Sequence, residues 1–404
     1  MLQKERYWVP SRSYDIKASV KNLDLEIYNV EIVTSVARPY QTIIIDFFID
    51  PDDVILEEIY GGEIIKLSIT LLQEIEQPSD ELNYELIYVS NPGGFDMTIK
   101  NINSEIEQQD RSPMKIITVP KNSYITMNTL INKIYLDKTP KEMIEDYVAE
   151  TKATLEYDTE KQFIETIDQT IIPPLTLYKS LHYLDSVYGL HTGITTYYCD
   201  YENTLKIMNL TTRIKQPQIF TIYQLTNGSN NDDIMEKSLD GKHFYTYNNI
   251  SSDYIGNSVF AVLAKTMKHI VKPRDTLYTL IEKDLETLSE EQGLISKNAI
   301  IRYDTNIERT KYYTDHTGYD SSETFINTAK KISSLAVLGV LIEKNLNVPL
   351  LIRVGEPVIF ETKNPNYIDL TGKYILRSSD INFYRQGDWQ ATCSLTLMRT
   401  TKTN

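Results

Sequence analysis

The stretch RVGEPVIFE, Arg353–Glu361, opens an apolar strand with a turn that contains a glycine, a glutamate and a proline. Much earlier the chain uses nearly the same opening in YGGEIIKLSIT, Tyr60–Thr70. In each stretch the Gly–Glu pair, Gly355–Glu356 or Gly62–Glu63, leads into a run with apolar residues at alternate positions. Alternation with a period of two is typical of a strand with one buried face. The two turns therefore predict two similar strand openings within one chain.

The order of the segments that follow the two turns is also similar. The first turn is followed by YELIYVS and FDMTIKN, and the second by KYILRSS and CSLTLMR. The distance from Gly62 to Tyr84 is 22 residues, and that from Gly355 to Tyr374 is 19. We interpret this order as two copies of one small antiparallel β-barrel. The alternative is that any two antiparallel sheets share such a succession of turns and strands.

Residues 1–105 are predicted to form the first, tube-like β-barrel domain. The strand candidates are YDIKASV, QTIIIDFFI, EIIKLSITLL, ELNYELIYVS and FDMTIKNI. Several short strands separated by turn residues favour a small barrel or sandwich. DPDDVILEEIYGG has acids and a proline at its start and glycines at its end. This pattern predicts one short helix.

Residues 106–210 are predicted to form a mixed α+β domain. In TPKEMIEDYVAE, Thr139 and Glu142 fit a capping box around Pro140, which predicts a helix start. LTLYKSLHYLDSVYGL has apolar residues at helical spacing, and GITTYYCDYENTLKIMNL predicts a hairpin that turns at Glu202–Asn203. Helical spacing is also expected in SYITMNTLINKIYL, at Met127, Leu130, Ile131 and Ile134.

Residues 211–320 are predicted to be an elaboration that partly contributes to the second barrel, and residues 321–404 a helix plus the second β-barrel domain. The helix is expected in SSETFINTAKKISSLA, and a hairpin is expected to turn at RQGD. On its return strand Trp389, Ala391, Cys393, Leu395 and Leu397 share one face. The predicted fold class is α+β and β-rich. It consists of two similar small antiparallel β-barrels with a mixed α+β domain and an elaboration between them.

Composition argues against nucleic-acid binding. The 404 residues include 41 bases and 56 acids, which gives a formal net charge of −15. Binding to duplex DNA requires clustered Lys and Arg side chains that face the phosphates. The densest basic stretch, AKTMKHIVKPR at Ala264–Arg274, is better interpreted as a solvated charged face. The net charge is compatible with an acidic channel through which DNA passes without binding.

The two cysteines and the N-terminus bear on the compartment. Cys199 and Cys393 lie in apolar, strand-like runs and are expected to be buried free thiols. The N-terminal MLQKERYWVPSRSYD lacks the apolar region of a signal peptide, and no run approaches a membrane-spanning length. We expect a soluble protein made in a reducing cytoplasm, without membrane insertion.

The sequence lacks the common catalytic and metal-binding motifs. Gly-x-Ser-x-Gly, a complete phosphate loop and His-Glu-x-x-His are all absent, and the five histidines are scattered. The acids leave a paired-carboxylate glycosidase open in principle. The segment NNDDIMEKSLDG lacks the spacing of a calcium loop. We therefore predict no catalytic, cofactor-binding or metal residues and no enzymatic activity. The residues singled out are the structural turn residues Gly62, Glu63, Gly355 and Glu356.

The C-terminal pattern resembles a known protein family. It consists of a helix, a strand, the Gly–Glu turn opening an apolar strand, LTGKYIL, a hairpin and a last strand that ends in Arg399. This order resembles the baseplate hub proteins of contractile bacteriophage tails and the related N-terminal part of type VI secretion spike proteins. YGGEIIKLSI and the helix–hairpin region LHYLDSVYGL…YYCDYENTLKIMNL are similar to that family as well.

The resemblance implies a structural hub in the virion tail baseplate. Three chains with two barrels each would form a homotrimeric ring with approximate sixfold symmetry. The implied partners are the central spike, the tail tube or its initiator ring, the tape measure protein and baseplate wedge proteins, with DNA only in passage. The chain ends at Asn404, so the spike is expected to be a separate protein. The alternatives are another baseplate or distal tail ring component, a tail-associated cell-wall hydrolase and a carbohydrate-binding adhesion protein.

Overall fold

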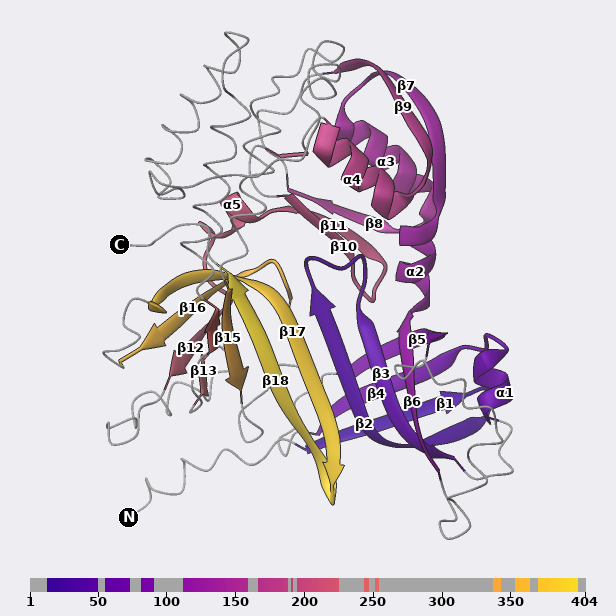
Figure 1. Ribbon diagram of the computed structural model, residues 1–404, viewed down its shortest axis with the longest axis vertical. Helices are drawn as coiled ribbons and strands as arrows, with labels where there is room; N and C mark the ends of the chain where they lie inside the picture. The colour runs from indigo at the N-terminus through magenta and orange to yellow at the C-terminus, as the bar shows by residue number, and fades with distance from the viewer. Residues whose placement is uncertain are drawn as a thin grey trace.

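The computed structural model describes residues 13–49, 55–72, 81–90, 112–158, 166–187, 190–191, 195–224, 243–246, 251–253, 337–342, 353–363 and 370–398. Strands dominate these residues, and a few short helices accompany them (Figure 1). The predicted β-rich α+β class is therefore confirmed.

Six strands from the first part of the chain pair in a closed circuit. They are β1 (Ser13–Val20), β2 (Leu23–Ser35), β3 (Thr42–Ile49), β4 (Ile65–Leu72), β5 (Glu81–Ser90) and β6 (Ser112–Pro120). Each pairs antiparallel with its neighbour in the order β1-β2-β3-β6-β5-β4, and β4 pairs with β1. Alternate side chains such as Val30, Ile45 and Ile69 are fully buried. A closed circuit leaves no unpaired strand edge between its members.

Four of the predicted N-terminal strands and the short helix are confirmed. The strands are β1, β3, β4 and β5, and the helix is α1 (Ile55–Tyr60). The sequence did not predict β2 and β6. β6 begins beyond residue 105 but pairs with β3 and β5 of the circuit. The fifth strand candidate, FDMTIKNI, lies outside the described residues.

The last part of the chain supplies the second group of strands. Its members are β12 (Phe220–Gln224), β13 (His243–Thr246), β14 (Ser251–Asp253), β15 (Val337–Ile342), β16 (Pro357–Thr362), β17 (Gly372–Gln386) and β18 (Asp388–Met398). They pair in the order β13-β12-β16-β17-β18-β15-β14, which is an open row in the described part of the chain. The predicted hairpin at RQGD is confirmed, because β17 and β18 pair antiparallel around Gly387.

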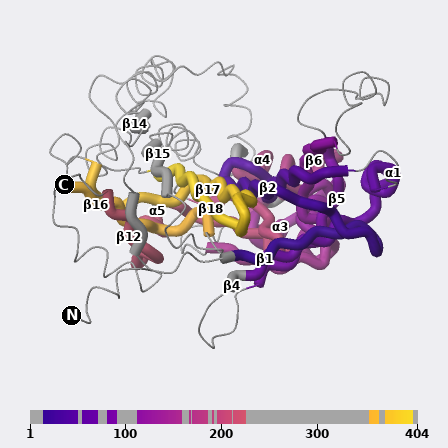
Figure 2. Tube along the Cα trace, turned by 90° about the horizontal axis from the view of Figure 1, so that it is seen from below, coloured from indigo at the N-terminus to yellow at the C-terminus, as the bar shows by residue number. Residues whose placement is uncertain are grey.

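The two groups meet along a seam. β17 pairs antiparallel with β2 from Ser378 opposite Ser35 to Tyr384 opposite Asn29. β1 also touches β18 where Tyr14 lies opposite Trp389. Figure 2 shows β17 and β18 lying beside the strands of the six-strand circuit. One large sheet therefore runs through both groups, and one continuous hydrophobic core lies within them.

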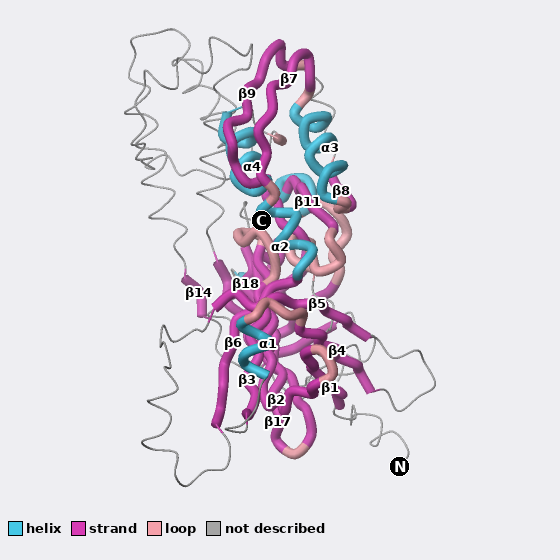
Figure 3. Tube along the Cα trace, turned by 90° about the vertical axis from the view of Figure 1, so that its right-hand side faces the viewer, coloured by secondary structure: helices cyan, strands magenta, loops and turns pink. Residues whose placement is uncertain are grey.

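The middle of the chain forms a separate layer of helices and small sheets. Its elements are α2 (Lys121–Asn128), β7 (Leu130–Lys138), α3 (Pro140–Thr151), β8 (Thr154–Tyr157), β9 (Ile167–Thr176), α4 (Leu177–Val187), β10 (Thr195–Cys199), β11 (Thr204–Asn209) and α5 (Leu210–Arg213). β7 pairs with β9, and β10, β11 and β8 form a second sheet. The helices α3 and α4 lie between these two sheets (Figures 1 and 3).

The β10–β11 hairpin has a core on each of its faces. Both strands are almost entirely buried. Tyr197 and Ile207 pack in the core of the middle region, whereas Tyr198 and Met208 pack in the core of the two strand groups. Because successive side chains of a strand point to opposite faces, one hairpin can join two cores.

The helix starts and turns of the middle region agree with the sequence analysis, with one exception. Thr139 and Glu142 form the predicted capping box at α3, and the hairpin turns at Asn203, which has φ +62°. The expected helical spacing from Met127 to Ile134 is wrong, because α2 ends at Asn128 and Thr129 is extended. Leu130 and Ile134 belong to β7 and are exposed. The helix candidate SSETFINTAKKISSLA, residues 321–336, lies outside the described residues.

Candidate functional site

The Gly62–Glu63 turn ends helix α1 in a Schellman arrangement. Glu63 N–H donates to Glu58 O over 3.1 Å, and Gly62 N–H donates to Ile59 O over 3.1 Å. Gly62 has φ +87°, and a Cβ placed on it would meet nothing within 4 Å. Lys21 pairs with both Glu58 and Glu63, and all three side chains are accessible to solvent. This turn therefore uses glycine for its backbone angle alone.

The Gly355–Glu356 turn is buried at the start of β16. Gly355 N–H donates to Leu376 O over 2.7 Å, and Leu376 N–H donates to Glu356 O over 2.9 Å. Gly355 has φ +86°, and a Cβ there would lie 2.5 Å from Met208 Cε and 2.6 Å from its Sδ. Met208 is itself fully buried. Glycine thus provides the backbone angle here, and a Cβ would in addition force the end of the buried Met208 side chain of β11 to shift.

Arg213 at the end of α5 binds the same turn through its side chain. Its guanidinium contacts three carboxylates, with Nε 2.6 Å from Asp158 Oδ2, Nη1 2.7 Å from Glu356 Oε1 and Nη2 2.7 Å from Glu156 Oε1. The Arg213 side chain is only 6% exposed. We name Arg213, Glu156, Asp158 and Glu356 the Arg213 cluster. It ties the end of β8 and helix α5 to the turn before β16.

Electrostatics within the Arg213 cluster favour the ionised form of Glu156. Burial on its own raises the pKa of Glu156, but the hydrogen bond from Arg213 and the charges of Arg213 and Lys206 outweigh it, so that this pKa lies below its ordinary value. Asp158 also accepts a hydrogen bond from the backbone N–H of Asn209. A buried charge is tolerated only when its partners satisfy it, and here one arginine satisfies three acids.

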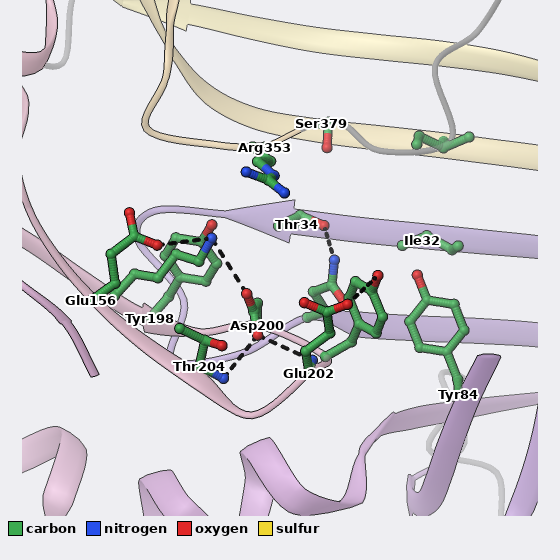
Figure 4. Close-up of a pocket in the computed structure, with 14 residues that line it drawn as sticks. Ile32, Thr34, Tyr84, Glu156, Tyr198, Asp200, Glu202, Thr204, Arg353 and Ser379 are labelled. Atoms are coloured by element: carbon green, nitrogen blue, oxygen red, sulfur yellow. Dashed lines mark hydrogen bonds and ion pairs between the residues drawn. The ribbon is translucent and has the colours of Figure 1, made fainter. Parts of the chain in front are cut away.

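A cavity of about 230 Å³ lies between the seam and the β10–β11 hairpin (Figure 4). Ile32 and Thr34 of β2 and Ser379 and Ile381 of β17 form one wall. The opposite wall comes from β8 and the β10–β11 hairpin, and Arg353, Gln41 and Tyr84 complete the lining. The hairpin and β8 residues are Glu156, Tyr198, Asp200, Tyr201, Glu202, Thr204 and Lys206. Lys206 Nζ lies 3.4 Å from both Glu156 Oε2 and Asp200 Oδ2.

The β7–β9 pair carries apolar side chains on its outer face. Leu130, Ile134, Leu136 and Ile171 are each more than half exposed, and Ile134 lies directly opposite Ile171. The other face of the pair packs against α3 and α4 in the core of the middle region. Exposed apolar groups that cluster on one face are typical of a contact surface.

The described histidines and cysteines have structural surroundings. His182 Nδ1 lies 3.0 Å from Tyr197 Oη, and His191 Nε2 lies 2.7 Å from Asp158 O. Cys199 and Cys393 are free and buried, as predicted, and burial raises the pKa of the Cys199 thiol to about 12. Within the described ranges, no cluster of three His, Cys, Asp or Glu side chains is placed to hold a metal ion. None of the described helices is long and apolar enough to cross a membrane.

The four predicted turn residues lie at two separate places in the structure. Gly62 and Glu63 lie at the end of α1, whereas Gly355 and Glu356 lie against the middle region. Sequence reasoning missed Arg213 and Met208, the two residues that hold the second turn. The one usable signal is Arg213 itself, an arginine that ends the short LTTR helix directly after an apolar strand.

No protein-family model matches the sequence, and no curated protein is significantly similar to it. Solved structures are similar in fold. The 43 kDa tail protein of prophage MuSo2 from Shewanella oneidensis aligns with a TM-score of 0.55 at 9% identity, over 96% of this chain and 99% of that chain. A tail protein from Neisseria meningitidis aligns with a TM-score of 0.51 at 11% identity, over 96% of this chain and 97% of that chain. This chain therefore has the fold of those tail proteins, and the similarity to phage tail proteins expected from its sequence is confirmed at the level of the fold.

Proposed function

We propose that this protein is a structural hub of a contractile phage tail baseplate. Three copies form a homotrimeric ring with pseudo-sixfold symmetry, which joins the sixfold tail tube to the threefold central spike. The bore of the ring passes the tape measure protein and later DNA. The protein has no enzymatic activity in this role, and its place is the virion tail.

The observation that carries the proposal is the pairing of β17 with β2. It joins the six-strand circuit to the second group of strands in one sheet. In each group the strand after the Gly–Glu turn pairs antiparallel with the strand that holds the tyrosine, since Leu67 lies opposite Tyr84 and Val358 lies opposite Tyr374. The likeness in fold to two tail proteins over almost the whole chain supports the same role.

We propose that the two groups are copies of one barrel, within a division of the chain at 1–105, 106–210, 211–320 and 321–404. The register differs by two residues between the two groups. Gly62 lies five residues before Leu67, which is opposite Tyr84. Gly355 lies three residues before Val358, which is opposite Tyr374. A shift of two keeps the same side chains on the same face. Two similar barrels side by side in each of three chains give six barrels around one axis.

The side of the seam that faces away from the core is proposed to line the bore. On this side, residues of neighbouring strands lie opposite each other in pairs. The pairs include Asp46 of β3 with Asn29 of β2, Glu31 of β2 with Asn382 of β17, and Asp380 of β17 with Ser394 of β18. These side chains are polar or acidic, while most of their neighbours on the other face, such as Ile45, Ile381 and Leu395, are buried and apolar. Acids along a channel repel phosphates and keep DNA from adhering. A ring whose bore is basic or neutral would contradict this assignment.

The assembly has partners on both sides in this proposal. They are the central spike on one side, the tail tube or its initiator ring on the other, and baseplate wedge proteins around the outside. The exposed apolar face of β7–β9 supports a role within an assembly, because a chain that acts alone gains nothing from four such exposed side chains.

Light scattering of the purified chain across a concentration series tests the proposal. A trimer has three times the 46.7 kDa of one chain, and electron micrographs of it should have threefold rings with six similar lobes. A chain that stays monomeric at all concentrations, and also in the presence of its spike protein, would contradict the proposal. A zymogram on peptidoglycan checks the absence of hydrolase activity in the same preparation.

A further inference from the structure

The cavity between the seam and the β10–β11 hairpin has charges of opposite sign on its two sides. Arg353, from the segment that precedes β16, lines one side of it, and Glu202 lines the wall of the hairpin (Figure 4). Both side chains are exposed, so they mark its mouth. No ion pair of Arg353 is found among the described residues, although Arg353 is close enough to Tyr201 to act on the pKa of its phenol. The cation and the anion therefore face each other across the cavity without contact.

The other cation of the cavity is already compensated. Lys206 lies between Glu156 and Asp200, at 3.4 Å from each. Asp200 is further occupied by hydrogen bonds from the backbone N–H groups of Glu202 and Thr204. Glu202 Oε1 accepts a hydrogen bond from the Tyr201 hydroxyl over 3.2 Å, but neither Glu202 nor Arg353 has an ion pair among the described residues, so these two are the charges that a ligand can meet.

The inner walls offer one acceptor without a donor and two phenols as well. Gln41 is 8% exposed and donates to Thr34 Oγ1 over 2.9 Å, but its Oε1 has no donor. Tyr84 and Tyr198 also line the cavity, and burial raises the pKa of both phenols, which keeps them protonated as donors. Buried polar groups of this kind are normally satisfied by a ligand or by ordered water.

We propose that this cavity binds a single α-amino acid as its zwitterion, with the carboxylate at Arg353 and the ammonium group at Glu202. A guanidinium binds a carboxylate through two parallel hydrogen bonds, and charge-assisted bonds are about twice as strong as neutral ones. The volume of about 230 Å³ lies below the range of pockets for drug-sized ligands, which favours a ligand smaller than a nucleotide or a lipid. The site stands apart from the proposed role in the tail.

The charges of the lining argue against the other small ligands. The cavity has three carboxylates, Glu156, Asp200 and Glu202, and two cations, Lys206 and Arg353. A phosphate dianion would add to the excess of negative charge. A neutral sugar would leave Arg353 and Glu202 without a counter-charge. The zwitterion compensates both and leaves the net charge unchanged.

The test is isothermal titration of the full chain with each of the standard L-amino acids in turn. The best binder is then compared with its N-acetyl derivative, which lacks the ammonium group, its amide, which lacks the carboxylate, and glucose. We expect saturable binding of the amino acid with a dissociation constant below about 10 mM, and binding at least about tenfold weaker for both derivatives.

Two variants assign the site. Arg353→Gln should weaken binding of the amino acid at least about tenfold, and Glu202→Gln should weaken it as well. The matched control is Arg385→Gln, because Arg385 is an exposed arginine of β17 that does not line the cavity. Far-UV circular dichroism and the Tm without ligand establish that each variant folds. Glu202 and Arg353 lie on different segments. If one of the two variants does not fold, the other still measures the contribution of its charge to binding.

Three outcomes would overturn the proposal. If no amino acid binds, the cavity holds water only. If the derivatives or glucose bind as tightly as the amino acid, the two charges do not select the ligand. If Arg385→Gln weakens binding as much as Arg353→Gln, the site lies elsewhere.

Discussion

The two Gly–Glu turns have the same backbone angle for different reasons. Gly62 has φ +87° and Gly355 has φ +86°. The first turn ends a helix at the surface, and its glutamate meets an exposed lysine. The second is buried against Met208, and its glutamate meets an arginine that is 6% exposed. Equal local conformation therefore coexists with very different surroundings, and substitutions should separate the two.

The largest difference is expected between the two cations. Arg213→Gln leaves three carboxylates of the Arg213 cluster without their common partner, and breaking a buried ion pair costs about 3 kcal/mol or more. Lys21→Gln removes a lysine whose side chain is 47% exposed, and such surface pairs contribute less than about 1 kcal/mol. Urea unfolding of both variants measures the free energy of unfolding. Equal losses would mean that the Arg213 cluster does not hold the second turn.

Alanine substitutions at Gly62 and Gly355 compare the steric surroundings of the two turns. Gly62→Ala has room for its Cβ, so only the unfavourable backbone angle remains, at about 1 kcal/mol. Gly355→Ala adds an overlap with Met208, and the expected total is about 3 kcal/mol. Denaturant midpoints of both variants check this order.

A double variant identifies the cause of that difference. Met208→Ala removes the atoms that the new Cβ would meet, so the cost of Gly355→Ala should fall to that of Gly62→Ala in this background. If the cost stays the same, the close approach of Met208 is not its origin.

The seam between the two strand groups should have its own pH dependence. Burial and the nearby Glu31 carboxylate raise the pKa of Asp380 to about 6 from 3.8, although Arg38 acts in the opposite direction. The folded chain then holds a proton that the unfolded chain has lost, so stability falls as the pH rises from about 4 to about 6. Above that range the full penalty persists.

Asp380→Asn removes this penalty. We expect the variant to be about 1 kcal/mol more stable than the parent at pH 7, a value reduced for the partial exposure of Asp380, and equally stable at pH 4. The free energy of unfolding at the two pH values measures it. Asp46→Asn serves as the control, because Asp46 lies on the same face of the sheet but has Asn29 and Lys115 as partners. A gain that is the same at both pH values would contradict the role of ionisation.

Local signals explain what the sequence predicted. The capping box at Thr139, the hairpin at Asn203 and the alternation of β18 each depend on residues a few positions apart, and all three are confirmed. The Gly–Glu turns were predicted for the same reason. The contacts that distinguish them were not, because Met208 and Arg213 lie more than a hundred residues before Gly355 and meet it only after folding.

Long-range pairing also explains the remaining errors. β2 pairs with β17, and β6 pairs with β3. No local sequence pattern predicts either pairing, so these two strands were missed. The exposed Leu130 and Ile134 were assigned to a helix because their spacing also fits a helical face, and the extended conformation of Thr129 decides against it. Similarly, the cavity at the seam combines residues from the beginning, the middle and the end of the chain, so that no local pattern predicts it.

The smallest contrast is expected between the two glutamates. Glu356→Gln weakens one of the three contacts of Arg213, and two acids remain, so the expected cost is about 1 kcal/mol. Glu63→Gln should cost less than about 0.5 kcal/mol, because Glu63 is 46% exposed and Lys21 keeps Glu58. The Glu356 effect should vanish in the Arg213→Gln background, whereas that of Glu63 should not change. If the effects of Glu63→Gln and Arg213→Gln on the free energy of unfolding are not additive, the two turns are energetically coupled. The contrast between a surface turn and a buried turn would then be wrong.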